Sequence, residues 1–311
     1  MYTTFYGLNE EPFRLTPDPR FLHLAEPHRE VLTSLVGGVL QRKGILVTTG
    51  PIGTGKTTLL HATLHFLSSQ TGAVPRLSTA FVTNPALTRE ELLEAILDEF
   101  EVSCTSTSKP RRLAALHEML MSIQRSGGTS VLVVDEAHLL TMELLEEVRL
   151  LTNTDLHQEK ILQVILSGQP ELLPVLRRPE LRALKQRVAS WSQLRPLTLP
   201  ETRAYIEERL HSAGLHAANP ICSPALDAIH NFSQGVPRLI NLLCDKCLWL
   251  GFNAKAKQIG PEIVQQAATL LEIDTACQEE AYVEPVGVRM SRSTMDLLID
   301  SLKRNRAMAR E

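Results

Sequence analysis

The chain has 311 residues, of which 43% are hydrophobic and 22% are charged. These values are ordinary for a soluble globular protein, and the length suffices for two domains with a sizeable buried core. The net charge of −3 excludes a global electrostatic attraction to nucleic acid or to an anionic membrane, although a local basic patch remains compatible with it.

The cysteines and the hydropathy pattern indicate the cellular compartment of the protein. Five unevenly spaced cysteines favour a reducing compartment. Cys244 and Cys247 have C-x-x-C spacing, but they lie in an apolar helical pattern without a second Cys/His pair nearby, so we expect core packing rather than a metal or redox site. No apolar run approaches the ~18 residues of a membrane span, and the N-terminus lacks signal-peptide features. These observations predict a cytoplasmic protein.

Residues 1–27 combine prolines and glycines with aromatic side chains. This composition predicts an extended, irregular segment that is too apolar to be a free tail. We therefore expect it to pack on the domain that follows. A helix is expected next over residues 27–39, and a strand over residues 45–49.

The stretch at residues 50–57 follows that strand and precedes a helical pattern. Its spacing is G-x-x-x-x-G-K-[ST], and the fixed positions with their flanks argue against an accidental Gly-rich turn. Backbone N–H groups and the helix N-terminus would cradle phosphate oxygens. Lys56 would reach the β- and γ-phosphates, and the Thr57 hydroxyl would ligate Mg²⁺. The expected nucleotide contacts are Gly50, Pro51, Ile52, Gly53, Thr54, Gly55, Lys56, Thr57 and Thr58.

Strand and helix patterns alternate from the phosphate loop to residue 198. Such alternation predicts an α/β fold in which helices cover both faces of a parallel sheet. Strands are expected over 79–83, 130–134 and 162–166, with an edge strand over 190–197, and helices over 90–101, 111–124 and 142–152.

Two carboxylates follow the apolar run at residues 130–134. Strand C-termini in open parallel sheets line the ligand crevice, so Asp135 would lie beside the phosphate loop and hold Mg²⁺ through its water shell. Glu136 would orient or deprotonate the attacking water. In isolation the pair could simply cap the next helix, but the upstream phosphate loop favours the catalytic interpretation.

Polar residues that come after the Asp-Glu pair could also act on the γ-phosphate. Gln169 follows the next strand and could hydrogen-bond the water or the γ-phosphate, a role for which Ser167 competes. Arg187 could project across a subunit interface and stabilise transition-state charge in a neighbour's site. Arg182 and Lys185 are alternatives to Arg187, and a solvated basic helix explains the same pattern.

Beyond Pro200 the strand patterns stop, and a second, all-helical domain is predicted. Arg238 begins one of its helices and could fold this domain over the nucleotide by contacting the γ-phosphate. A polar linker and a basic amphipathic helix at 293–304 are expected after it. The helices of the domain are expected over 201–212, 224–232, 237–252 and 261–271.

These residues together resemble an AAA+ ATPase: phosphate loop, Asp-Glu pair, polar sensor, finger arginine, Gly-x-Pro-Arg and helical lid, in that order. More narrowly, residues 1–272 resemble the ExeA/GspA-type ATPases of bacterial secretion and exopolysaccharide-export systems. The narrower likeness lies in Phe5–Leu8, Pro12–Phe13, Leu15–Leu22, His28–Glu30 and Gly168–Leu172.

The resemblance implies a P-loop ATPase core, ATP and Mg²⁺ as cofactors, hydrolysis to ADP and phosphate, and a homo-oligomer with Arg187 acting in trans. It places the adenine between the N-terminal segment and the lid, near Leu22 and Pro237. The expected division is an N-terminal segment at 1–27, an AAA+ core at 28–198, a helical lid at 199–272, and a linker with a basic helix at 273–311.

Three functions are compatible with these features. The first is an ATPase that drives a secretion or polysaccharide-export machine, held at the inner membrane by a protein partner. Secretion members usually continue into a membrane span and a periplasmic region, which we expect this stand-alone form to lack. The second function is therefore a DNA-associated switch such as a transposition helper. The third is a non-hydrolysing nucleotide-sensing scaffold, which Glu136 and Arg187 disfavour. Residues 135–138 spell the DEAH of a helicase, but no second helicase core follows.

Overall fold

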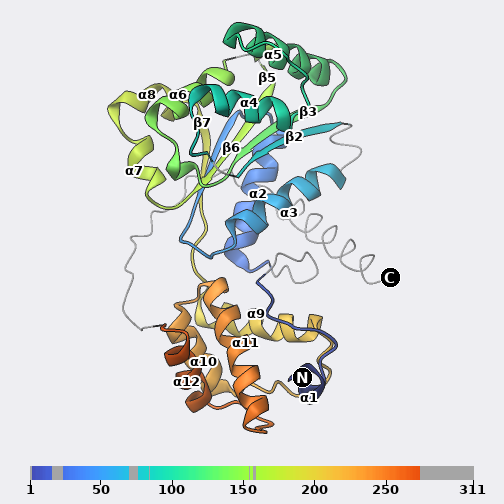
Figure 1. Ribbon diagram of the computed structural model, residues 1–311, viewed down its shortest axis with the longest axis vertical. Helices are drawn as coiled ribbons and strands as arrows, with labels where there is room; N and C mark the ends of the chain where they lie inside the picture. The colour runs from blue at the N-terminus through green and yellow to red at the C-terminus, as the bar shows by residue number, and fades with distance from the viewer. Residues whose placement is uncertain are drawn as a thin grey trace.

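The computed structural model describes residues 2–15, 24–69, 76–83, 85–153, 155–156 and 159–273 (Figure 1). The neighbourhood of Leu22 and the basic helix expected over 293–304 lie outside these residues. Within the described part of the chain, no helix is long and apolar enough to cross a bilayer.

Five parallel strands form the central sheet in the order β2-β3-β6-β1-β7, as the alternating patterns predict. Among the strands that the structure describes, β7 pairs with β1 alone, so it is an edge strand. It begins two residues earlier and ends four residues earlier than expected. The strands are β1 Ile45–Thr49, β2 Leu77–Val82, β3 Thr129–Val134, β6 Leu162–Gly168 and β7 Val188–Gln193.

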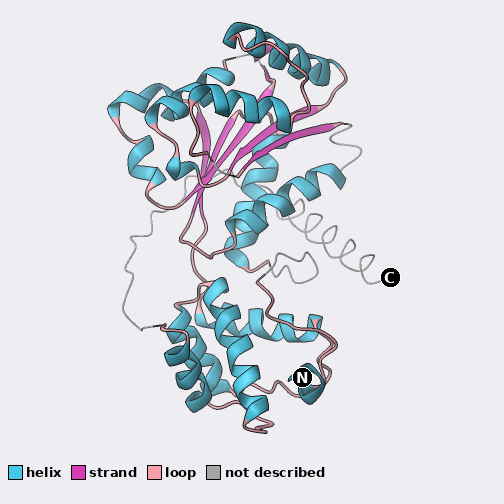
Figure 2. Ribbon diagram, viewed as in Figure 1, coloured by secondary structure: helices cyan, strands magenta, loops and turns pink. Residues whose placement is uncertain are grey.

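Helices cover both faces of this sheet (Figure 2). Successive side chains of a strand point to opposite faces, and here both sets are apolar because both faces are buried. Helices α2 (Glu26–Leu40) and α3 (Lys56–Ser69) pack on Leu46, Val131, Val133 and Ile165. Helices α4 (Arg89–Glu99), α5 (Lys109–Arg125) and α6 (Met142–Leu151) belong to the opposite cluster with Ile45, Val47, Leu132, Val134, Val164 and Leu166.

Several short elements were not expected from the sequence. They lack the length that gives a helix or strand a recognisable periodicity. They are η2 Ala137–Leu139, the antiparallel pair β4 Asp155–Leu156 and β5 Glu159–Lys160, α7 Leu172–Leu176, η3 Pro179–Leu181 and α8 Arg182–Lys185.

Four helices with their own apolar cluster follow the sheet: α9 Leu199–Ser212, α10 Ser223–Ser233, α11 Pro237–Asn253 and α12 Pro261–Leu270. A proline lies in the first turn of each, where the missing N–H is tolerated. Cys244 and Cys247 are buried in this cluster. Burial raises the pKa of both thiols, that of Cys247 to about 12, which fits the expected core packing.

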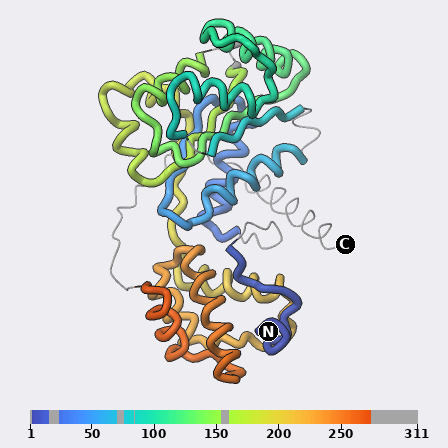
Figure 3. The backbone as a smooth tube through the Cα atoms, in the orientation of Figure 1, coloured from blue at the N-terminus to red at the C-terminus, as the bar shows by residue number. Residues whose placement is uncertain are grey.

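The N-terminal segment differs from the expectation. Residues Tyr2–Tyr6 form a helix, α1, and the segment packs on the four-helix cluster rather than on the sheet domain that follows it (Figure 3). The Tyr2 hydroxyl donates to Asp245 Oδ1 at 2.6 Å, and Arg209 Nε donates to the Pro12 carbonyl oxygen at 2.6 Å. The aromatic residues of the segment thus pack against the helical domain.

The helical domain contacts the sheet domain through backbone hydrogen bonds. The Leu197 N–H donates to the Gly235 carbonyl oxygen at 2.9 Å, and the Arg238 N–H donates to the Gly53 carbonyl oxygen at 3.2 Å. Gly235 has a φ of +72°, and a Cβ built on it would lie 1.9 Å from the Leu197 carbonyl oxygen. This junction therefore requires a glycine.

Replacing Gly235 with alanine should lower the free energy of unfolding by about 2 kcal/mol or more beyond the cost of the left-handed backbone alone, because the added carbon overlaps the main chain. Gly7→Ala is a matched control, since Gly7 has a φ of +71° and nothing within 4 Å of the added Cβ. The control should cost only about 1 kcal/mol. Denaturant unfolding measures both, and equal losses would contradict the overlap.

Candidate active site

The loop at residues 50–57 joins β1 to α3, as its flanking patterns predict. Lys56 is the first residue of α3 and is 7% exposed. Its ammonium donates to the carbonyl oxygens of Gly50 at 2.7 Å and Pro51 at 3.0 Å. The loop therefore curls around the lysine, so the only fixed positive side chain of the motif lies at the loop's centre.

The Asp135 carboxylate is the polar centre of the site. The Thr57 hydroxyl donates to its Oδ2 at 2.5 Å, and the Ser167 hydroxyl donates to its Oδ1 at 2.8 Å. The Glu136 backbone N–H also donates to Oδ1, at 3.0 Å. Asp135 is 3% exposed, so these three donors fix a buried carboxylate at one position.

The two residues expected to hold magnesium are thus adjacent. Thr57 and Asp135 bring a hydroxyl and a carboxylate oxygen into contact beside the phosphate loop. Mg²⁺ in proteins takes oxygen ligands and keeps several waters, with only one or two protein groups in its first sphere. The donor set fits that ion.

Glu136 directly follows Asp135 in a left-handed backbone conformation, with φ 51° and ψ 34°. Non-glycine residues in this region are uncommon and concentrate at functional sites. The Glu136 side chain is 40% exposed, and its Oε2 lies 3.4 Å from Nδ1 of His138. The carboxylate is therefore accessible at the edge of the site while Asp135 is enclosed.

The end of β6 carries both candidate sensors, and they lie in different environments. Ser167 is fully buried and is committed to Asp135. Gln169 is half-buried, and its backbone N–H donates to His138 Nδ1 at 3.4 Å. The Ser167 hydroxyl is thus engaged with Asp135. Gln169 therefore stays the candidate for a direct contact with the γ-phosphate.

The two arginines lie in different places relative to the site. Arg238 contacts the phosphate loop, whereas Arg187 lies at the opposite end of the sheet, because the next residue, Val188, pairs with Ile45 at the start of β1. Arg238, exposed in the first turn of α11, meets the phosphate loop through its backbone contact with Gly53. Arg187 precedes β7 and is half-buried, and its Nη1 donates to the Thr152 hydroxyl at 3.5 Å. Its alternatives Arg182 and Lys185 are exposed on α8.

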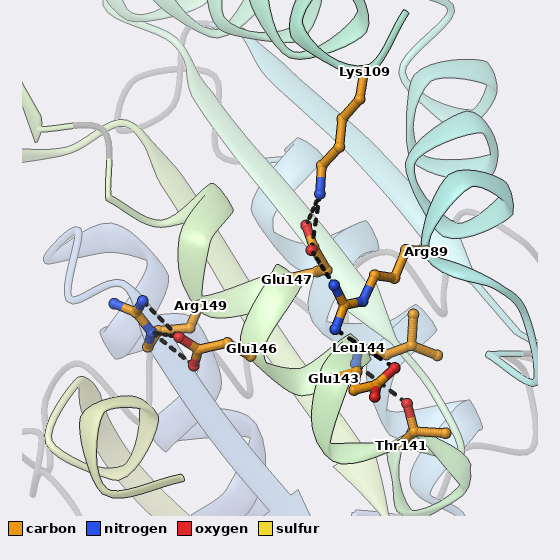
Figure 4. Close-up of polar contacts among 8 residues, drawn as sticks. All are labelled: Arg89, Lys109, Thr141, Glu143, Leu144, Glu146, Glu147 and Arg149. Atoms are coloured by element: carbon orange, nitrogen blue, oxygen red, sulfur yellow. Dashed lines mark hydrogen bonds and ion pairs between the residues drawn. The ribbon is translucent and has the colours of Figure 1, made fainter. Parts of the chain in front are cut away.

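Helix α6, which follows the Asp-Glu pair, is tied to its neighbours by ion pairs (Figure 4). Glu147 lies 2.8 Å from Lys109 of α5 and 3.8 Å from Arg89 of α4. Within α6, Glu146 and Arg149 pair at 2.7 Å. The hydrogen bonds from Arg149 are the main reason that the pKa of Glu146 is lowered, and the charge of Arg187 contributes less. The network holds the helix against which Arg187 rests.

Two histidines contact the site without having been given a role from the sequence. His28 of α2 is buried, and its Nε2 lies 3.0 Å from the Thr54 carbonyl oxygen in the loop. It belongs to the His28–Glu30 stretch that carries part of the family resemblance, which was the only signal available. His138 lies between Glu136 and Gln169, and its place in the sequence gave no sign of the second contact.

Known proteins match this chain in sequence. A family model described as "AAA domain" matches residues 39–176. General secretion pathway protein A of Aeromonas hydrophila is 41% identical over 254 residues, which are 81% of this chain and 45% of that protein. The chain thus spans less than half the length of this relative.

Similar solved structures extend the likeness of fold. Drosophila ORC bound to DNA has a TM-score of 0.65 at 18% identity, covering 85% of this chain and 65% of that one. Cdc6p of Pyrobaculum aerophilum has a TM-score of 0.64 at 18% identity, covering 84% and 70%. The RuvB branch migration motor of Thermotoga maritima has a TM-score of 0.52 at 20% identity, covering 85% and 74%. At these identities the likeness concerns the fold alone.

Ser167→Ala should raise the Mg²⁺ concentration needed for half-maximal ATP binding about five-fold, because Asp135 loses a donor worth roughly 1 kcal/mol. Ser192→Ala is the matched control, since Ser192 is a buried strand serine that donates to the Val47 carbonyl oxygen at 3.2 Å. Magnesium titrations with a fluorescent ATP analogue measure both. An unchanged requirement in Ser167→Ala, or an equal shift in both variants, would contradict the assignment.

Proposed function

We propose, from the premise that this chain is an AAA+ ATPase related to General secretion pathway protein A, that it works as an oligomer whose ATP cycle switches a macromolecular assembly. The observation that carries the proposal is the contact between Thr57 of the phosphate loop and Asp135 at the end of β3, with Glu136 at its exposed edge. Phosphoryl transfer needs positioning and charge neutralisation. Thr57, Asp135 and Glu136 would supply the positioning, and Lys56 together with a bound Mg²⁺ would supply the positive charge.

Each residue then has a defined part in the proposed reaction. Lys56 and the loop N–H groups would bind the phosphates, and Thr57 and Asp135 would hold Mg²⁺, Asp135 through water. The ion, when bound, neutralises charge on the β- and γ-phosphates. Glu136 orients the attacking water or takes its proton, and Gln169 contacts the γ-phosphate.

The two arginines act from opposite sides of the nucleotide. Arg238 closes the helical lid over the γ-phosphate, since its backbone already meets the loop at Gly53. Arg187 acts in the site of a neighbouring subunit. Its side chain lies against Thr152 at the end of α6, which supports a role outside the loop of its own chain.

A secretion or polysaccharide-export machine is the assembly we favour, because the relative with 41% identity is a secretion pathway protein. A protein partner would hold the chain at the cytoplasmic side of the inner membrane. The DNA-associated alternative, a transposition helper, has one observation in its favour. Four exposed cations lie on α8 and on the connection that precedes it, and none of them pairs with an acidic group among the described residues: Arg177, Arg178, Arg182 and Lys185.

ATP turnover per subunit should rise with protein concentration, because each complete site includes an arginine from a neighbour. Glu136→Gln should lower it at least about a hundred-fold while ATP still binds. Turnover measured with and without duplex DNA separates the two partners, since stimulation by DNA that fades with salt favours the transposition helper. Bound ATP without turnover in the unaltered chain would instead support a nucleotide-sensing scaffold.

Arg187→Ala should abolish most turnover, yet an equal mixture with Glu136→Gln should recover roughly a quarter of the original rate if subunits mix at random. In mixed interfaces one subunit supplies Glu136 and the other supplies Arg187. Steady-state turnover of the separate and mixed variants measures this. If mixing restores nothing, Arg187 does not act in trans.

Arg182→Ala and Lys185→Ala, tested alongside, should leave turnover within about two-fold of the original. A loss of turnover in either variant would assign the trans-acting role to that residue instead of Arg187.

A further inference from the structure

His138 lies between the ends of two neighbouring strands. It belongs to the short helix η2, which follows β3, and its side chain is 13% exposed. One ring nitrogen, Nδ1, lies 3.4 Å from Glu136 Oε2 and 3.4 Å from the backbone nitrogen of Gln169 at the end of β6. The same atom thus faces the water-activating carboxylate and the sensor residue.

The two neighbours make opposite demands on that atom. A ring nitrogen either carries a proton and donates, or has a lone pair and accepts, and it has one in-plane direction for either. The Gln169 N–H needs Nδ1 as an acceptor, whereas the Glu136 carboxylate needs it as a donor. His138 can satisfy only one of them at a time. A shift of the proton between Nδ1 and Nε2 exchanges the partners with no change in charge.

The hydrogen bonds among His138, Glu136 and Gln169 are the part of the site that can change partners. Asp135 is fixed by its three donors, while His138 is the only side chain that pairs with the Glu136 carboxylate among the described residues. The backbone of η2 lies close to the end of β6, as shown by the 3.0 Å that would separate a Cβ on Gly168 from the His138 backbone nitrogen. A displacement at the end of β6 would therefore also displace His138.

We propose that His138 is a positioning residue that couples the orientation of the Glu136 carboxylate to the position of Gln169. The inference rests on the proposed function, in which Gln169 contacts the γ-phosphate and Glu136 activates water. When Gln169 engages the γ-phosphate, its N–H leaves Nδ1, and Nδ1 then donates to Glu136 and holds the carboxylate for attack. Without the γ-phosphate, Nδ1 stays with Gln169 and Glu136 is unrestrained.

Two polar variants that differ in amide position test this. An asparagine side chain carries its amide near the place of Nδ1, whereas a glutamine side chain carries it near the place of Nε2, so we compare His138→Asn with His138→Gln. His138→Gln should lower kcat for ATP about ten-fold, with KM for ATP and affinity for a fluorescent ADP analogue changed by less than about two-fold. His138→Asn should retain kcat within about three-fold of the original. His117→Gln, on the exposed face of α5, is the control and should change nothing.

The outcomes separate coupling from simple structural support. Equal kcat values for His138→Asn and His138→Gln would overturn the proposal, as would a fall in kcat matched by an equal loss of ADP affinity. A rise in kcat would also overturn it. Glu136→Gln, measured alongside, tests the proposed function by itself, because retained turnover there removes Glu136 from the reaction whatever the His138 variants do.

Discussion

The buried Asp135 carboxylate is the constraint on which the site depends. It draws one hydrogen bond from the phosphate loop through Thr57 and one from β6 through Ser167. Burying a carboxylate at 3% exposure costs free energy unless its oxygens accept hydrogen bonds. Moving any of the donors away from Asp135 would therefore destabilise the folded protein. One side chain thus links the phosphate loop to β6 at the end of β3. Glu136 directly follows this fixed residue, so its backbone position is fixed as well.

Much of this arrangement could be predicted because it is local in the sequence. The phosphate loop has fixed spacing, and the strands of the sheet are buried on both faces, so their apolar runs are distinct. Asp135 and Glu136 were found because carboxyl ends of parallel strands converge on one edge. The edge position of β7, the strand that precedes the helical domain, was right, although its end was placed four residues too late.

What could not be predicted depends on contacts between distant segments. The aromatic character of the N-terminal segment indicated that it packs, but not on what, because Arg209 and Asp245 lie some two hundred residues away. The helix Tyr2–Tyr6 is too short to show a period. The second contact of His138 could not be predicted for the same reason, since it comes from Gln169, which follows a separate strand. Local sequence patterns predict secondary structure and motifs, whereas the residues that contact one another over long sequence distances are known only from the structure.

Strand order explains why the end of β6 is suited to couple the parts of the site. β6 lies between β1, which leads into the phosphate loop, and β3, which ends in the carboxylates. Its last two residues and the residue after them each contact a different part of the site. Ser167 donates to Asp135, the Gly168 carbonyl oxygen accepts from the Gly50 N–H at 3.2 Å, and the N–H of Gln169, which follows β6, donates to His138. A small movement of this strand end would therefore act at once on Asp135, the phosphate loop and the partner of Glu136. Packed interiors convert such shifts into changes of partner rather than gradual deformation.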